Sequence, residues 1–125
     1  MVGTGRLAPN LIEAHIATRP IKKVTIWGRT PAKAKALAET LSREDITIEN
    51  TENLESAAAN ADIISCATLS EEPLIQGSWL TPGVHIDLVG AFTPNMRETD
   101  DAVMQRADLL FVDTKEDALK KAGDL

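Results

Sequence analysis

The sequence predicts an α/β fold: a doubly wound parallel sheet with helices on both faces, in a single domain over residues 1–125. Two observations predict it. Short β-branched runs alternate along the chain with segments whose apolar residues recur at helical spacing, which is the order of a parallel sheet joined by right-handed crossovers. The composition is 43% hydrophobic but only 3% aromatic. The core must therefore be aliphatic, which suits a sheet covered by helices.

A glycine turn opens the chain. The run Gly3-Thr4-Gly5-Arg6-Leu7-Ala8 has the spacing Gly-x-Gly-x-x-Ala, which joins the first strand to the first helix in doubly wound folds of the Rossmann type. Only Met1-Val2 precedes the run, so the first strand is expected to be truncated. A helix is expected over Pro9–Thr18, and Arg19-Pro20 closes it because the residue before a proline resists the α conformation.

The elements after this helix alternate between strand and helix. Lys23–Trp27 is a β-branched run that predicts a strand, and the next helix runs from Thr30-Pro31 to about Ser42, with the threonine as a side-chain cap and the proline in the first turn. Leu69–Gly83, which contains prolines and glycines, is expected to be mostly loop. The other expected elements are strands over Ile46–Glu49, Asp62–Ala67, Val84–Val89 and Leu109–Val112, and helices over Leu54–Asn60, Asp100–Arg106 and Lys115–Lys121.

Charge and cysteine usage exclude several classes of protein. The net charge of −6 argues against a nucleic-acid surface, because binding phosphates requires a positive field. Cys66 is the single cysteine, and with His15 and His85 far apart no metal-ligand spacing exists. The sequence contains neither a leader nor a long apolar run, so we expect a cytoplasmic protein that does not bind membranes.

The glycine turn predicts a dinucleotide site. The helix that follows it offers free amides and the positive end of its dipole to a pyrophosphate. A tight strand-to-helix turn without a ligand is the alternative. In the predicted site, Gly3, Gly5 and Ala8 shape the turn, and Thr4, Arg6 and Leu7 supply amides.

The end of the second strand indicates which dinucleotide binds. An NAD site usually has an acid there to hold the ribose 2′-hydroxyl, but this stretch is Trp27-Gly28-Arg29-Thr30. Arg29, Thr30 and Lys33 instead form a cluster suited to the 2′-phosphate of NADP. We therefore expect NADP(H) rather than NAD(H). The alternative is that Arg29 and Lys33 are ordinary solvated charges.

Two further segments are expected to line the cofactor. Ala67-Thr68 and Val89-Gly90 each follow a predicted strand, so both should open at the carboxyl edge of the sheet, where ligands bind in doubly wound folds. Ordinary turn chemistry is the alternative for both. No residue of the chain is assigned a catalytic role.

The ordered motifs resemble those of the ornithine cyclodeaminase and mu-crystallin family over essentially the whole chain. They are GTGRLA, IWGRTPAKAKALA, ADIISCAT, EEPLIQGSWLTPGVHIDLVGA, MRETDD and FVDTKEDALKKAGDL. The resemblance implies a Rossmann cofactor domain. It also implies a substrate and dimerisation domain that is absent from this chain, a homodimer as the full-length protein, and an isolated chain that is inactive.

The resemblance also bears on the reaction. Cyclodeaminases of the family carry a reactive Asp directly after the turn that matches Gly90-Ala91, and Phe92 stands at that position here. Phenylalanine cannot exchange a proton, which counts against cyclodeamination. The run Gly-Ala-Phe-Thr-Pro followed by Met96-Arg97-Glu98 resembles the ketimine reductase branch of the family. This resemblance implies a reductase of cyclic imino acids such as Δ1-pyrroline-2-carboxylate. The alternatives are an ornithine cyclodeaminase with bound NAD, an alanine dehydrogenase-like enzyme and a non-catalytic cofactor-binding module.

Overall fold

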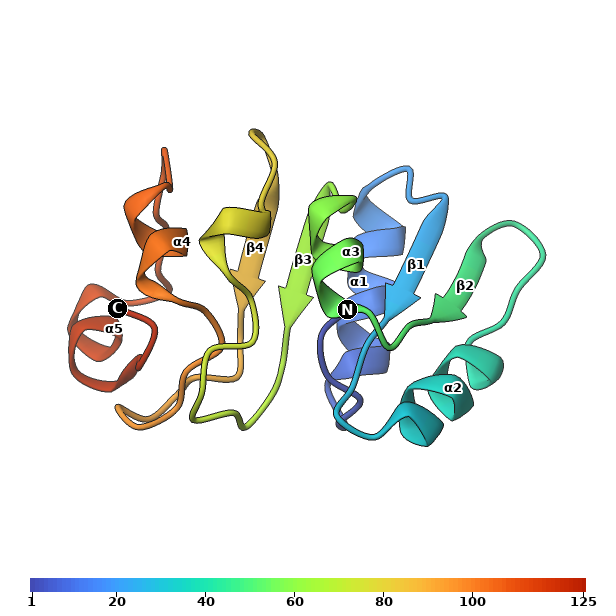
Figure 1. Ribbon diagram of the computed structural model, residues 1–125, viewed down its shortest axis with the longest axis horizontal. Helices are drawn as coiled ribbons and strands as arrows, with labels where there is room; N and C mark the ends of the chain where they lie inside the picture. Colours follow the sequence, from blue (N-terminus) through green and yellow to red (C-terminus); the bar gives the residue numbers. More distant parts are fainter.

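Short parallel strands run through the middle of the molecule, and their arrowheads point to one common edge (Figure 1). The computed structural model describes residues 1–125. The strands are β1 (Lys23–Ile26), β2 (Thr47–Asn50), β3 (Ile63–Cys66) and β4 (His85–Leu88). They pair in parallel as β1 with β2 and β3 with β4.

The two strand pairs are joined through the start of the chain. Val2 forms parallel bridges with Trp27, just after β1, and with Cys66 of β3. Its amide donates a hydrogen bond to the Ser65 carbonyl oxygen at 2.8 Å, and its carbonyl accepts one from the Ala67 amide at 2.9 Å. The order across the sheet is β2, β1, Val2, β3, β4, which is the order of a doubly wound dinucleotide-binding sheet. The expected fold class is therefore confirmed, and Val2 occupies the place of the first strand between β1 and β3.

Helices cover both faces of the sheet, as expected. α1 (Ala8–Thr18) lies behind the sheet and α3 (Leu54–Ala59) lies in front of it in Figure 1. The other helices are α2 (Pro31–Thr40), the 3-10 helix η1 (Gly77–Trp79), α4 (Asp101–Gln105) and α5 (Lys115–Lys121).

Two small apolar cores result, one on each face. One core consists of Ile12 of α1, Ile26 of β1, and Ala34 and Ala38 of α2. The other contains Val2, Ala58, Ile64, Cys66, Ile75 and Val103. Alanines on α2 and α3 let those helices lie close to short strands, which is how an aliphatic sequence fills this core.

The cap of α2 differs in part from the expectation. Pro31 occupies the first turn and Thr30 is the N-cap, but the Thr30 side chain makes no capping hydrogen bond. The Thr30 carbonyl oxygen instead accepts from the amides of Lys33 and Ala34. The turn is thus closed by the backbone, and the Thr30 hydroxyl is not used in the cap.

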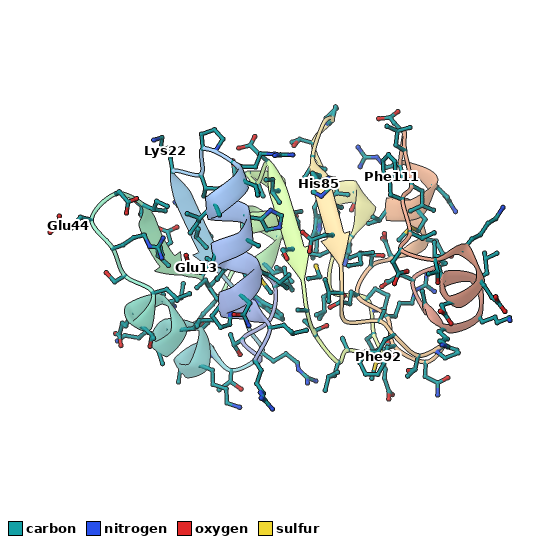
Figure 2. The ribbon with its side chains drawn as sticks, turned by 180° about the vertical axis from the view of Figure 1, so that it is seen from behind. Glu13, Lys22, Glu44, His85, Phe92 and Phe111 are labelled. Atoms are coloured by element: carbon teal, nitrogen blue, oxygen red, sulfur yellow. The ribbon has the colours of Figure 1, made fainter.

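The predicted strand over Leu109–Val112 is wrong. This segment has no regular structure, and its apolar side chains are exposed, Phe111 by 83% (Figure 2). β-propensity is realised only when a strand finds a partner, and here no strand pairs with the segment. The expected loop over Leu69–Gly83 is mostly irregular but contains η1 and a bridge between Ile75 and Thr99.

A cavity of about 670 Å³ lies between β1 and β3, and its walls include α1 and α3. Lys23 and Thr25 line it from one strand, and Ile63 and Ser65 line it from the other. The Met1 ammonium donates to the Thr25 carbonyl oxygen at 2.9 Å, and burial lowers the pKa of this ammonium. The two strand pairs are thus held together at their carboxyl ends, where Val2 bridges them.

We predict that Val2→Pro destabilises the protein, because proline has no amide to donate to the Ser65 carbonyl oxygen. The loss of this buried hydrogen bond should cost about 1–3 kcal/mol in the free energy of unfolding, measured by urea denaturation. Val2→Ile keeps the amide and is the matched control. Equal midpoints for the two variants would show that the bridge does not join the strand pairs.

Candidate functional site

The glycine turn lies at the carboxyl edge of the sheet and is tightly packed on one side only. Gly3 is buried with φ +116°, and a Cβ placed on it would lie 2.6 Å from the Ala67 carbonyl oxygen. Gly5 is exposed, and a Cβ placed on it would meet no atom within 4 Å. Ala8 is fully buried at the start of α1. The turn thus packs on β3 through Gly3 and leaves an open surface at Gly5.

The amides of this turn have no partner within the chain. Those of Thr4, Gly5, Arg6 and Leu7 donate no hydrogen bond. No side chain caps α1, and no acidic residue lies in its first turn. The start of α1 therefore presents unpaired N–H groups and the positive end of a helix dipole, an arrangement that binds anions such as phosphate.

The end of β1 lies directly beside this turn. The Gly3 amide donates to the Trp27 carbonyl oxygen at 2.9 Å, and a Cβ on Gly28 would lie 2.7 Å from the Thr4 side chain. The chain then continues through Arg29 to the start of α2.

Two cations and one hydroxyl group follow β1, and their side chains are free. Arg29, Thr30 and Lys33 are all exposed, and no hydrogen bond or ion pair holds their side chains. Arg6 of the glycine turn is likewise exposed and unpaired. The structure thus brings the cation cluster to the edge that carries the glycine turn, and no carboxylate follows β1 where an NAD site usually has one.

The loops after β3 and β4 meet at the same edge, as the sequence predicts. A Cβ on Gly90 would lie 2.1 Å from the Thr68 carbonyl oxygen, so only glycine allows this approach. The Val89 amide donates to the Cys66 carbonyl oxygen at 2.9 Å. The Ala67 amide donates a hydrogen bond to the Val2 carbonyl oxygen. The four predicted residues therefore lie together at this edge: Ala67, Thr68 and Val89 form its surface, and Gly90 is buried among them.

Glu98 ties these two loops together, and sequence reasoning missed it. Its Oε1 accepts from the Thr68 amide at 2.6 Å and from the Thr68 hydroxyl at 2.8 Å, and its Oε2 accepts from the Gly90 amide at 2.8 Å. Glu98 is fully buried. Burial raises the pKa of its carboxyl group, against the hydrogen bonds from Thr68 and Gly90, which lower it. Its position in the Met96-Arg97-Glu98 motif was the only sign in the sequence.

Glu98 changes which groups of this surface are free to bind a ligand. The amides of Thr68 and Gly90 and the Thr68 hydroxyl proton are directed inward, toward the carboxylate. These groups therefore shape the surface rather than donate to a bound molecule. Apolar side chains point outward there instead: Leu69, Val89 and Phe92 are exposed by 64%, 40% and 59%, and Phe92 lies at the carboxyl edge in Figure 2.

The histidines and Cys66 lie outside this surface. His15 Nε2 lies 2.8 Å from Asp87 Oδ2, and the Ser65 hydroxyl donates to Asp87 Oδ1 at 2.7 Å, so His15 ties α1 to the sheet. Cys66 is buried, which raises the pKa of its thiol. His85 is exposed at the start of β4. No group of acidic, histidine or cysteine side chains could hold a metal ion, and no helix has the length and apolarity needed to cross a membrane.

Comparisons with known proteins show the family of this chain. The model of the ornithine cyclodeaminase/mu-crystallin family matches residues 1–125. The chain is 43% identical to Delta(1)-pyrroline-2-carboxylate reductase of Paracoccus denitrificans, over 100% of this chain and 40% of that protein. It is 35% identical to mouse ketimine reductase mu-crystallin, over 100% of this chain and 39% of that protein.

Among solved structures, the chain is similar to Thermococcus litoralis Delta(1)-pyrroline-2-carboxylate reductase in complex with NADH and L-proline. The TM-score is 0.93 with 33% identity, over 99% of this chain and 38% of that one. The 125 residues thus span about 40% of the length of these relatives.

We predict that the two glycines of the turn respond differently to alanine. Gly3→Ala should destabilise the fold by about 1–3 kcal/mol, because its φ is positive and the new methyl group meets the Ala67 carbonyl oxygen. Gly5→Ala meets no atom and its φ is not positive, so the free energy of unfolding should stay within about 0.5 kcal/mol of the wild type. Urea denaturation measures both, and equal losses would contradict this account of the turn.

Proposed function

This chain belongs to the ornithine cyclodeaminase/mu-crystallin family, and on that premise we propose that it is the NAD(P)H-binding domain of a reductase. The proposed substrates are cyclic imino acids such as Δ1-pyrroline-2-carboxylate, which are reduced to the amino acid. The observation that carries the proposal is the start of α1, where unpaired amides lie beside the cations that follow β1. The relatives named as Δ1-pyrroline-2-carboxylate and ketimine reductases support the choice of reaction.

The glycine turn would hold the pyrophosphate. The free amides of Thr4, Gly5, Arg6 and Leu7 are the donors that a pyrophosphate requires, and the open surface at Gly5 leaves room for it. Gly3 packs closely against the Ala67 carbonyl group, and Ala8 is buried in the core. These two contacts fix the turn on the side away from the proposed ligand. These donors are in place before a ligand arrives, so binding does not have to order the turn.

A preference for NADP(H) is part of the proposal. Arg29 and Lys33 are unpaired cations, and Thr30 has a free hydroxyl, so all three can turn toward a 2′-phosphate. Charge-assisted bonds of this kind contribute about 1.5–3 kcal/mol each. An acid that could hold a 2′-hydroxyl does not follow β1. The Thermococcus litoralis relative binds NADH in its solved structure, and the titration below compares the two cofactors directly.

A bound nicotinamide would supply the hydride for the reduction of a C=N bond. The chain's own part is to bind and orient that ring, which Ala67, Thr68, Val89 and Gly90 border in our proposal. The sheet and Glu98 fix the backbone of these residues. In our proposal they therefore hold the nicotinamide ring in one orientation toward the substrate. No side chain of this surface exchanges protons with a substrate, which leaves the proton donor to residues outside the chain.

Phe92 favours the reductase over a cyclodeaminase. It stands where cyclodeaminases of the family carry a reactive Asp, and it is exposed at the edge of the site. A phenyl ring cannot take a proton from an amine or pair with its charge. It presents an apolar surface instead, which is compatible with the ring of a cyclic imine.

The rest of the proposal concerns the whole protein. Because the chain spans about 40% of its relatives, we place the substrate-binding and dimerisation regions outside residues 1–125 and propose that the complete protein is a cytoplasmic homodimer. Binding to nucleic acid is not part of the proposal, given the net charge of −6. The isolated chain is then expected to bind cofactor without turnover.

We predict that calorimetric titration shows tighter binding of NADPH than of NADH. Arg29→Ala should weaken NADPH binding about tenfold or more, because it removes a charge-assisted bond to the 2′-phosphate, and should leave NADH binding unchanged. Lys22→Ala is the matched control, since Lys22 lies at the opposite edge of the sheet (Figure 2). Equal loss for both cofactors, or an equal effect of Lys22→Ala, would argue against a 2′-phosphate site at Arg29.

The reaction is tested in a chimera in which residues 1–125 replace the matching 38% of the Thermococcus litoralis reductase. We predict that the chimera consumes NADPH with preformed Δ1-pyrroline-2-carboxylate and needs no ammonia. Release of ammonia from ornithine would identify a cyclodeaminase instead. A requirement for free ammonia would identify an amino-acid dehydrogenase, and cofactor binding without turnover would identify a binding module.

A further inference from the structure

Two buried carboxylates support the loops after β3 and β4, and no cation is paired with either. Glu98 is fully buried and Asp124 is 5% exposed, and neither takes part in an ion pair with Lys or Arg. Buried carboxylates without a cation are costly unless hydrogen bonds satisfy them. Their partners therefore indicate what they hold in place.

Glu98 uses both carboxylate oxygens, one for each loop. Oε1 accepts the amide and the hydroxyl of Thr68, and Oε2 accepts the amide of Gly90. Thr68 and Gly90 lie on different loops, one after β3 and one after β4. A single planar group thus fixes the distance between two segments that have no strand pairing of their own beyond Leu88.

Asp124 accepts hydrogen bonds from the backbone of Glu98 and from Thr99. Its Oδ1 accepts from the Glu98 amide at 2.9 Å, the Thr99 amide at 2.8 Å and the Thr99 hydroxyl at 3.0 Å. Asp124 follows α5, and a Cβ on the preceding Gly123 would lie 1.8 Å from the Met96 carbonyl oxygen. The segment after α5 therefore packs closely against the backbone segment that contains Glu98.

The two carboxylates differ in one respect that can be tested. All three hydrogen bonds of Asp124 go to Oδ1, and its Oδ2 has no partner. An asparagine can keep the same three bonds through its carbonyl oxygen. A glutamine at Glu98 cannot, because its amide nitrogen must face either Thr68 donors or the Gly90 amide.

We propose that Glu98 is a positioning residue that sets the spacing of the Thr68 and Gly90 loops and thereby the seat of the nicotinamide half of the cofactor. This rests on the proposed function. Glu98 itself does not touch the cofactor, since it lies beneath the backbone of both loops. The adenosine half depends on the glycine turn and on Arg29, which Glu98 does not contact.

The test compares two ligands, NADPH and 2′,5′-ADP, which lacks the nicotinamide half. Glu98→Gln should weaken NADPH binding about tenfold and reduce the fluorescence enhancement of bound NADPH, because a hydrogen bond to a charged acceptor is lost. Its affinity for 2′,5′-ADP should remain that of the wild type. Asp124→Asn, the matched control, neutralises the other buried carboxylate and should leave the binding of both ligands unchanged.

Thr68→Val keeps the inference testable if Glu98→Gln does not fold, as judged by circular dichroism. It removes the hydroxyl bond to Oε1 and the bond that the same hydroxyl accepts from the Ser70 amide at 3.3 Å, while the Thr68 amide still donates to Oε1. It should weaken NADPH binding while 2′,5′-ADP binding stays the same. Wild-type NADPH affinity in the folded variants overturns the inference. An equal loss of affinity for NADPH and 2′,5′-ADP in Glu98→Gln also overturns it. So does a loss of NADPH affinity in Asp124→Asn that equals the loss in Glu98→Gln. A wild-type chain that binds neither ligand overturns the proposed function together with this inference.

Discussion

The backbone hydrogen bonds of Met1 and Val2 are the constraint on which the rest of the structure depends. β1 and β2 form one pair of strands and β3 and β4 form another, and the bridges of Val2 align the carboxyl ends of the two pairs. That alignment places the glycine turn between the end of β1 and the end of β3. Without this alignment, the unpaired amides of the turn would not lie at one edge of the sheet between Arg29 and Thr68.

The two halves of the candidate site are built in different ways. The glycine turn and Arg29 depend on local structure, since a helix start and a strand end place their groups directly. The Thr68 and Gly90 loops depend on Glu98 and Asp124, which come from much later in the chain. One half is therefore set by neighbours in sequence, and the other is set by long-range contacts between buried carboxylates and backbone amides.

This difference explains which parts of the fold and of the candidate site could be predicted from the sequence. Alternating apolar periods and the glycine spacing predicted the fold and the edge at which the loops meet, because these features act over a few residues. The strand over Leu109–Val112 was wrong because pairing is a long-range property that its β-propensity does not contain. Glu98 was missed because a glutamate is mostly exposed in proteins, and nothing adjacent to it in the sequence marks it as buried.

The buried carboxylates also account for the character of the outward surface. Because Glu98 takes the inward donors of Thr68 and Gly90, the spacing of the loops does not depend on the side chains that face away from it. Leu69, Val89 and Phe92 are exposed and can be exchanged without loss of a hydrogen bond that shapes the loops. Loops held in this way can keep their backbone geometry while their outward-facing side chains change.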